Sequence, residues 1–353
     1  EFELSQNHTF FWDKYEKANY FYENILATGK EPLESRKVAF LLTTPQQDGG
    51  QWDMIVSLFQ KYGVVPKSVM PESANSSNSR DLNKYLNKLL RKHAVILRAM
   101  VEEDAGSDAI QSKKEELLAE VYEFLAISLG TPPQVFDFEY RDENNDYHID
   151  RELTPQMFYD KYIGVDLDDY VSIINAPTKD KPYNKSYTVE MLGNVVGGKE
   201  VKYLNVDMET FKKLTIAQLE QGESVWFGCD VGQSSTRDSG IMATNIYNMN
   251  ELYDVDFTMT KADRLDYGES LMTHAMVLTG VDLVDGKSTK WKVENSWGEK
   301  VGDKGFFVMS DEWMDEYTYQ VVIRKDLLTK EQLDAFNAEP TVLAPWDPMG
   351  ALA

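Results

Sequence analysis

Hydrophobic residues recur with a helical period in the first half of the chain and alternate as in strands in the second half. The first 30 residues are aromatic and charged, with spacings that predict one or two helices packed into a core. TTPQQDGGQWDMIVSLFQKYGVVP (43–66) starts as a turn around its proline and the pair Gly49-Gly50 and then becomes a helix, which Gly63 ends. The apolar positions of this helix follow the 3.6-residue period: Trp52, Ile55, Val56 and Phe59.

Residues 74–165 have a more polar and strongly helical pattern. A Ser/Asn-rich loop leads into one long helix, and SDAIQSKKEELLAEVYEFLAISLG (107–130) predicts another. Ser107 is the expected N-cap of this second helix, and Gly130 is its expected end. A third, short helix is expected at 154–164.

Strands dominate the chain beyond about residue 165. Short apolar runs with Gly, Asn and Asp between them predict strands at YVSIINAP, SYTVEML, SVWFGCDV, AMVLTGVDLV, KWKVENSW and GFFVMS. One helix interrupts them at 207–222, capped by Asp207. The tail AEPTVLAPWDPMGALA (338–353) contains three prolines and is expected to be an extended arm without regular structure. Helices followed by strands predict an α+β fold.

Composition narrows the class of protein. The 353 residues carry a net charge of -23, which disfavours binding to nucleic acid because phosphate backbones would be repelled. No apolar run approaches the ~20 residues that a membrane-spanning helix needs. A single cysteine, Cys229, excludes an internal disulfide framework and favours a reducing compartment, the cytoplasm. No Cys/His spacing suggests a zinc site, and no metal or organic cofactor is expected.

A histidine and an asparagine carry the candidate chemistry. MTHAMVLTGV (272–281) places His274 at the start of an apolar strand, and WKVENSWGEK (291–300) places Asn295 at the end of another. Taken alone, His274 is more often a structural residue and Asn295 a turn residue. Together, on neighbouring strands, they form an expected pair in which the amide oxygen orients the imidazole toward a nucleophile. Trp297 could cover their hydrogen bond and exclude water.

These segments resemble papain-like cysteine peptidases, and most closely the bleomycin hydrolase/aminopeptidase C branch. The resemblance rests on THAMVLTGV, WKVENSWGEKVGDKGFF, TTPQQDGGQWDM, KPYNKSYTVE with LGNVVGG, and the tail APWDPMGALA, so that it covers essentially the whole chain. It implies a hydrolase, specifically a cytoplasmic thiol aminopeptidase that acts on peptides. It also implies a homohexamer.

The resemblance assigns roles to individual residues. His274 would be the general base and ion-pair partner, Asn295 the group that orients it, and Gly49-Gly50 the clamp on the substrate backbone. The terminal carboxylate of Ala353 could pair with the free amine of the substrate, which would make the enzyme an aminopeptidase. The alternative is that the last residues form a frayed terminus, without a role in substrate binding.

The family's nucleophile, a cysteine in a Q…C-W segment before the Gly-Gly loop, does not occur in this sequence. Cys229 lies in an apolar strand, where an inert core residue is expected rather than a reactive thiolate. We therefore expect that a nucleophile segment precedes Glu1 and that residues 1–353 alone are an inactive fragment. A peptidase-like binding or scaffold protein without a nucleophile is the alternative.

The expected papain-like architecture has two lobes, with a helical insertion and an extended C-terminal arm. The chain would divide into the remainder of the helical left lobe with the Gly-Gly loop (1–73), the helical insertion (74–165), the β-rich right lobe with His274 and Asn295 (166–330), and an arm into the active-site cleft (331–353).

Overall fold

The computed structural model describes residues 2–352, which form two compact units. One unit comprises the chain up to Asp166 together with Met191–Glu200. The other comprises Leu167–Glu190 and Val201–Leu352. Each unit has its own cluster of buried apolar side chains. Within the described residues, no helix combines the length and apolar character that crossing a membrane requires.

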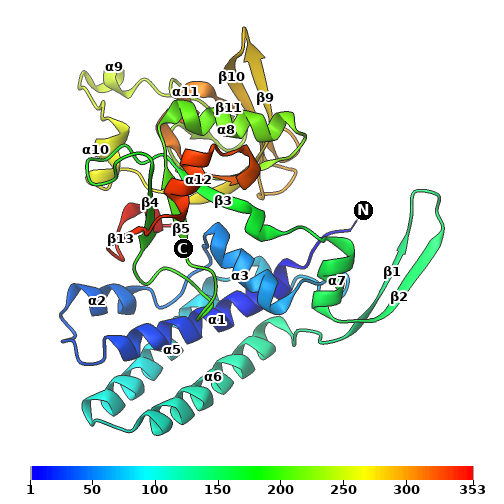
Figure 1. The fold of residues 1–353 in the computed structure, drawn as a ribbon, viewed down its shortest axis with the longest axis vertical. Helices are drawn as coiled ribbons and strands as arrows, with labels where there is room; N and C mark the ends of the chain where they lie inside the picture. The colour runs from blue at the N-terminus through cyan, green and yellow to red at the C-terminus, as the bar shows by residue number, and fades with distance from the viewer. Residues whose placement is uncertain (1, 353) are drawn as a thin grey trace. The chain divides into compact units, whose positions relative to one another are not determined.

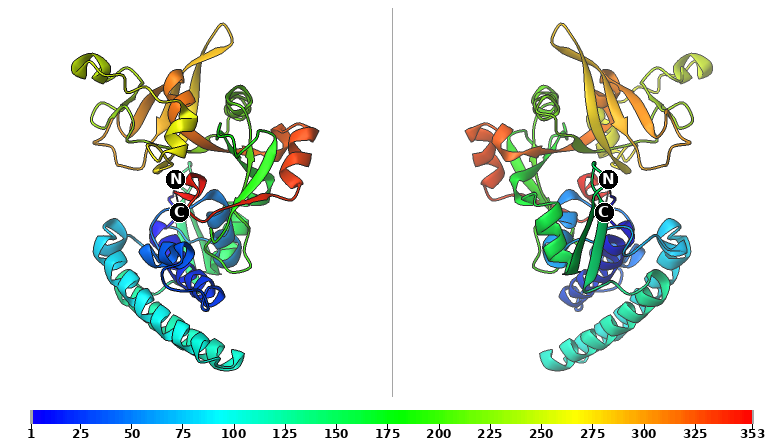
Figure 2. Two further views of the ribbon diagram at one scale, coloured as in Figure 1. Left: turned by 90° about the vertical axis from the view of Figure 1, so that its left-hand side faces the viewer. Right: turned by 90° about the vertical axis from the view of Figure 1, so that its right-hand side faces the viewer.

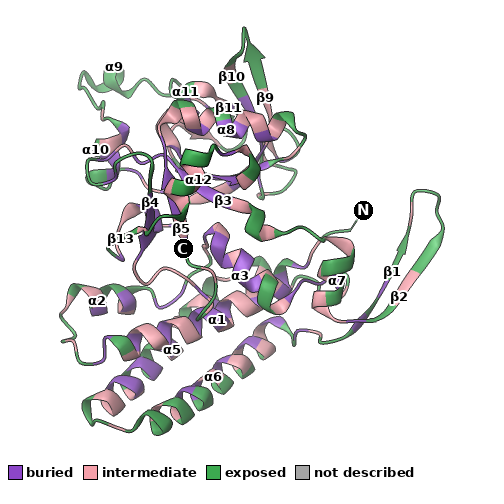
Figure 3. Ribbon diagram, viewed as in Figure 1, coloured by how far each residue is buried: buried purple, intermediate pink, exposed green. Residues whose placement is uncertain are grey.

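The first unit is helical. Its longest helices, α1, α5 and α6, contact one another (Figure 1), because each carries an apolar face that must be buried. Figure 3 shows buried stretches alternating with exposed ones along α5 and α6, as expected for amphipathic helices. The elements of this unit are α1 (Gln6–Ala27), α2 (Arg36–Thr43), α3 (Trp52–Tyr62), α4 (Ala74–Ser77), α5 (Arg80–Glu102), α6 (Ser107–Leu129), β1 (Phe136–Arg141), β2 (Tyr147–Leu153) and α7 (Pro155–Tyr162).

The helices predicted in this unit are confirmed, with two corrections. Ser107 is not the N-cap of α6: the helix already begins there, and the extended backbone before it belongs to Gly106, which has no side chain to form a cap. Gly130 does end the helix, with a φ of 90° that favours glycine. The second correction is the antiparallel hairpin of β1 and β2, which lies inside the segment expected to be helical.

The second unit is built on one eleven-stranded sheet of order β13-β4-β5-β3-β12-β6-β9-β10-β11-β8-β7. Most neighbours are antiparallel, and Figure 2 shows the β9–β10 hairpin as a long twisted ribbon. The elements are η1 (Leu167–Asp169), β3 (Tyr170–Ile174), β4 (Lys185–Val189), β5 (Lys202–Asn205), α8 (Met208–Glu220), β6 (Val225–Cys229), β7 (Ser235–Thr236), β8 (Ile241–Met242), α9 (Met249–Tyr253), α10 (Lys261–Asp266), β9 (His274–Val284), β10 (Lys287–Glu294), β11 (Phe306–Ser310), α11 (Asp311–Tyr317), β12 (Thr318–Arg324), η2 (Lys325–Leu327), α12 (Lys330–Asn337), β13 (Thr341–Leu343) and η3 (Pro348–Gly350).

The tail was expected to have no regular structure. This is wrong, because the tail contains two short elements. Strand β13 adds to the edge of the sheet, parallel to β4. A 3₁₀ turn, η3, follows, with Pro348 at its start and the Asp347 side chain accepting from the backbone N–H of Met349. Proline suits the first position of a helical turn, so the composition that suggested an irregular arm is compatible with this turn.

Candidate active site

His274 and Asn295 lie at the same end of one β-hairpin. Strand β9 begins at His274, and its antiparallel partner β10 ends at Glu294, directly before Asn295. In an antiparallel hairpin the end of the second strand lies beside the start of the first. Two residues 21 positions apart in the chain are thereby brought together.

A hydrogen bond of 2.9 Å joins Nε2 of His274 to Oδ1 of Asn295. The same amide oxygen accepts a 2.8 Å bond from the backbone N–H of Ser296, which identifies it as the acceptor end of the amide. Nε2 of His274 is therefore the donor of this bond, and Nδ1 is the ring nitrogen that accepts in the corresponding neutral tautomer. No residue in the described part of the chain forms a hydrogen bond with Nδ1. The pair thus leaves Nδ1 as the ring nitrogen without a partner among the described residues.

Trp297 lies against this pair. The centroid of its ring system is 4.9 Å from that of the His274 imidazole, with the planes inclined by 30°. Phe307 meets the indole edge-on at 5.9 Å, and the Arg237 guanidinium lies 4.8 Å from the indole centroid. Asn295 itself is only 8% exposed. A hydrogen bond shielded from water in this way is electrostatically stronger, so the imidazole orientation is well held.

Cys229 is a close strand neighbour of His274 but does not have the character of a nucleophile. The two residues are direct partners in the register between β6 and β9. The thiol is fully buried, and burial, followed by the nearby Asp230 carboxylate, raises its pKa well above the ordinary value. No side-chain hydrogen bond joins Cys229 to His274 in the described structure. The expected core location is confirmed, and a thiol that resists ionisation is a poor nucleophile.

The Gly49-Gly50 loop belongs to the first unit and directly precedes α3. Gly50 does not have a left-handed φ, and a Cβ added to it would meet no atom within 4 Å. Its backbone N–H and C=O form no hydrogen bond to another described residue. Neither packing nor backbone conformation within the unit requires glycine here, so the open space suits the close approach of a ligand backbone.

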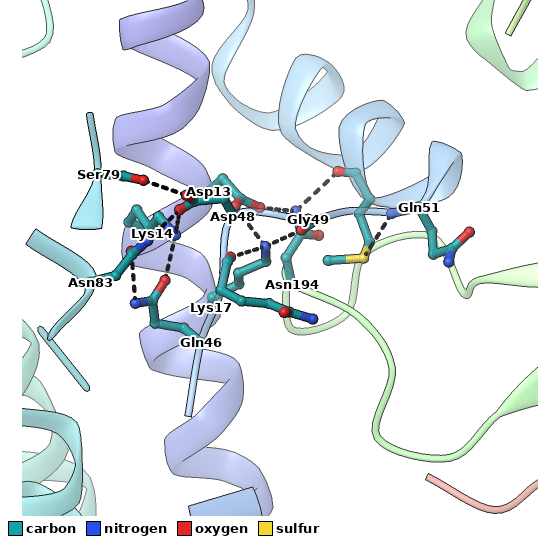
Figure 4. A network of polar contacts seen from close by, with 12 residues as sticks. Asp13, Lys14, Lys17, Gln46, Asp48, Gly49, Gln51, Ser79, Asn83 and Asn194 are labelled. Atoms are coloured by element: carbon teal, nitrogen blue, oxygen red, sulfur yellow. Dashed lines mark hydrogen bonds and ion pairs between the residues drawn. The ribbon is translucent and has the colours of Figure 1, made fainter. Parts of the chain in front are cut away.

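Two buried lysines hold this loop, and neither was expected from the sequence pattern (Figure 4). Lys14 of α1 donates to Oε1 of Gln46 at 2.5 Å and to Oδ1 of Asp48 at 2.6 Å. Lys17, one turn further along α1, donates to the carbonyl oxygen of Gly49 at 2.5 Å. Burial, and then the like charge of Lys17, lower the pKa of Lys14 to about 8. The only signal in the sequence is a pair of lysines among the aromatic residues of one helix.

The C-terminal arm is fastened within the second unit. Asp347 forms a 2.8 Å ion pair with Lys181, whose side chain is 3% exposed. Tyr203 donates its hydroxyl to the carbonyl oxygen of Met349 at 3.0 Å, and the Met349 side chain is fully buried. The arm is therefore an ordered part of this unit up to its penultimate residue.

The end of the arm lies near the strand that precedes the histidine. Leu352 is buried, and a Cβ built on Gly228 would lie 3.6 Å from its Cδ2 atom. Gly228 directly precedes Cys229, the strand partner of His274. Ala353, whose carboxylate is a predicted substrate-binding group, lies outside the described residues.

No group of three or more His, Cys, Asp or Glu side chains arranged to hold a metal ion occurs in residues 2–352. The polar side chains that the hairpin brings together are an imidazole and an amide.

Comparison with known proteins identifies the family of the chain. The family model described as the Peptidase C1-like family matches residues 1–350. The chain is 65% identical over 353 residues to Aminopeptidase C of Streptococcus thermophilus and 63% identical over 356 residues to that of Lactococcus lactis subsp. cremoris, covering all of this chain and 79% and 80% of those relatives. The crystal structure of pepw from Lactobacillus rhamnosis hn001 has a TM-score of 0.99 at 67% identity and covers all of this chain and 80% of its own. The chain, with its α+β fold, belongs to the Peptidase C1-like family.

Proposed function

We propose that the protein is a thiol aminopeptidase in which His274 is the general base and Asn295 orients it. The observation that carries this proposal is the 2.9 Å bond between Nε2 and the amide oxygen, which leaves Nδ1 as a free acceptor. The relatives that share at least 63% identity bear the name Aminopeptidase C. Cys229 is buried with a raised pKa, so we propose that the attacking thiol lies in the protein outside residues 1–353.

In the proposed cycle, Nδ1 of His274 takes the proton of the thiol, and the thiolate forms a bond to the carbonyl carbon of the scissile peptide. The imidazolium returns that proton to the leaving amine as the C–N bond breaks. A water molecule then attacks the thioester and gives a proton to Nδ1, and the thiol is regenerated as the released residue leaves. Asn295 stabilises the imidazolium throughout by accepting from Nε2.

Gly50 is proposed to bind the extended backbone of the peptide. Its N–H and C=O form no bond to another described residue, and a Cβ added to it would meet no atom within 4 Å. An extended peptide backbone offers the complementary acceptor and donor. The absence of a Cβ lets the two backbones approach closely.

The arm is proposed to restrict the enzyme to free amino termini. The ordered segment up to Leu352 supports this role, because Leu352 lies beside Gly228, one residue before the strand partner of His274. The carboxylate of Ala353 would pair with the α-ammonium of the substrate. The family resemblance also predicts a homohexamer, a cytoplasmic location and no cofactor.

The test compares two substitutions in the full-length protein, with aminoacyl and dipeptide substrates. We expect His274→Ala to lower kcat by at least about a thousandfold, because it removes the proton carrier. We expect Asn295→Ala to lower kcat by about ten- to a hundredfold, because only orientation is lost. Ser296→Ala, which leaves the backbone N–H in place, is the matched control and should retain the parent rate. Parent turnover in both His274→Ala and Asn295→Ala would refute the proposal.

A further inference from the structure

Two backbone carbonyl groups of the Gly-Gly loop converge on one buried ammonium group. Lys17, on α1, has a side chain that is 7% exposed. It donates to the carbonyl oxygen of Gln47 at 2.8 Å and to that of Gly49 at 2.5 Å, and it pairs with the Asp13 carboxylate at 2.8 Å (Figure 4). These three partners match the three donors of an ammonium group.

The geometry of the peptide bond links this contact to the neighbouring residue. The carbonyl of Gly49 and the N–H of Gly50 belong to one trans peptide unit, in which they point in opposite directions. With the carbonyl turned toward Lys17, the N–H of Gly50 is turned away from it. That N–H forms no hydrogen bond to another described residue, and a Cβ on Gly50 would meet no atom within 4 Å.

We propose that Lys17 is a positioning residue for substrate binding, since it fixes the peptide plane that aims the Gly50 N–H at the substrate backbone. This inference rests on the proposed function and adds the residue that sets the geometry of the clamp. Lys17 does not touch the substrate; it acts through the loop.

The surroundings of Lys17 explain how the charge is kept inside the unit. The Asp13 carboxylate balances it, and the Asn194 amide donates to the same carboxylate at 3.0 Å and to the carbonyl of Met54, on α3, at 3.1 Å. The network therefore ties α1, the loop and α3 together. Buried charges persist only when they are paired and hydrogen-bonded, and both conditions hold here.

Lys14 provides the internal comparison. It is fully buried on the same helix but donates to side chains of the loop, those of Gln46 and Asp48, rather than to carbonyl groups. Loss of Lys14 would loosen the loop without freeing the Gly49–Gly50 peptide plane directly. Of the two lysines, Lys17 is thus the one that determines the direction of the N–H.

The test is steady-state kinetics of Lys17→Met in the full-length protein, with Lys30→Met as the control. Lys30 forms an ion pair with Asp104 in which both side chains are more than three quarters exposed, so its loss removes the same charge away from the loop. We expect Lys17→Met to raise KM for dipeptide substrates about tenfold and to leave kcat within about threefold, because substrate positioning is lost and the base is intact. Lys30→Met should keep the parent KM.

Gly50→Ala tests the close approach of the substrate backbone to the loop, on which the inference depends. The added methyl group meets no atom of the chain, so the protein should unfold at the parent temperature. If the substrate backbone approaches Gly50, KM should still rise several-fold. An unchanged KM in Gly50→Ala, or in a folded Lys17→Met, overturns the inference, as does a fall in kcat alone. Failure of the proposed function is recognised separately, since His274→Ala would then keep the parent turnover.

Discussion

The Gly-Gly loop and the His274–Asn295 pair are held in place by different means. The loop has no hydrogen-bonded ladder of its own, and two buried lysines hold Gln46, Gln47, Asp48 and Gly49. His274 stands on a strand whose register is set on both sides by backbone hydrogen bonds, and its partner is a neutral amide.

The difference follows from where backbone polar groups find their partners. A strand satisfies its N–H and C=O groups in the sheet, so its side chains are free to carry chemistry. An irregular segment leaves carbonyl groups without partners, and a buried lysine can collect several of them. The arm resembles the loop in this respect. It has no continuous ladder of backbone hydrogen bonds beyond β13, and Lys181 holds it through an ion pair.

The largest expected effect is a loss of local stability of the arm when its buried lysine is replaced. Lys181→Met leaves the Asp347 carboxylate, which is 10% exposed, without its main partner. Removing one member of a buried pair costs about 3–5 kcal/mol, so the free energy of local opening should fall by up to that amount. Amide hydrogen exchange of residues 344–352 measures it. We also expect new cleavage of N-terminally blocked peptides.

The control for this prediction is Lys179→Met, two residues away, where the lysine is exposed. It should leave both exchange and specificity at the parent values. If the arm of Lys181→Met exchanges as slowly as that of the parent, buried charge is not what fastens it.

A smaller effect is expected on the pH dependence of stability, and it comes from α1, the helix that carries the two lysines. His8 of α1 is buried, accepts from Nε1 of Trp12 at 3.3 Å, and has a pKa lowered by burial from 6.5 to about 4. Between these pH values the unfolded chain binds a proton that the folded chain does not, so stability falls as the pH falls from 6.5 toward 4. The loss should reach about 3 kcal/mol.

Calorimetric unfolding of the parent and of His8→Gln, which keeps an acceptor for Trp12, measures this difference. The variant should lose less stability over that pH range. Some dependence should persist, because burial also lowers the pKa of His93. Parallel pH profiles for the two proteins would show that His8 does not titrate as described.

The sequence was sufficient to predict the His274–Asn295 contact. Alternating apolar residues define β9 and β10, and a hairpin brings their ends together whatever the rest of the fold does. The burial of Cys229 was predictable for the same reason, because an apolar strand in a large sheet places its residues in the core.

The lysine contacts could not be predicted in the same way. Lys17 meets Gln47 and Gly49 across 30 and 32 positions of chain, and a lysine on a helix is solvated by default. The arm was misjudged for a related reason: β13 exists because β4 offers it an edge, which the proline-rich composition of the tail does not disclose. The lysine contacts and β13 both depend on partners from segments that are distant in the sequence.

The smallest expected effect is also the most direct test of the central claim that His274 serves a thiol other than Cys229. The measurement is turnover of an aminoacyl substrate by full-length Cys229→Ala and Cys229→Val, before and after treatment with a thiol-alkylating reagent. Both variants should keep kcat within about twofold of the parent and remain fully blocked by the reagent, because Cys229 is a core residue. Loss of turnover in both variants, with folding intact, would contradict the account and make Cys229 the nucleophile.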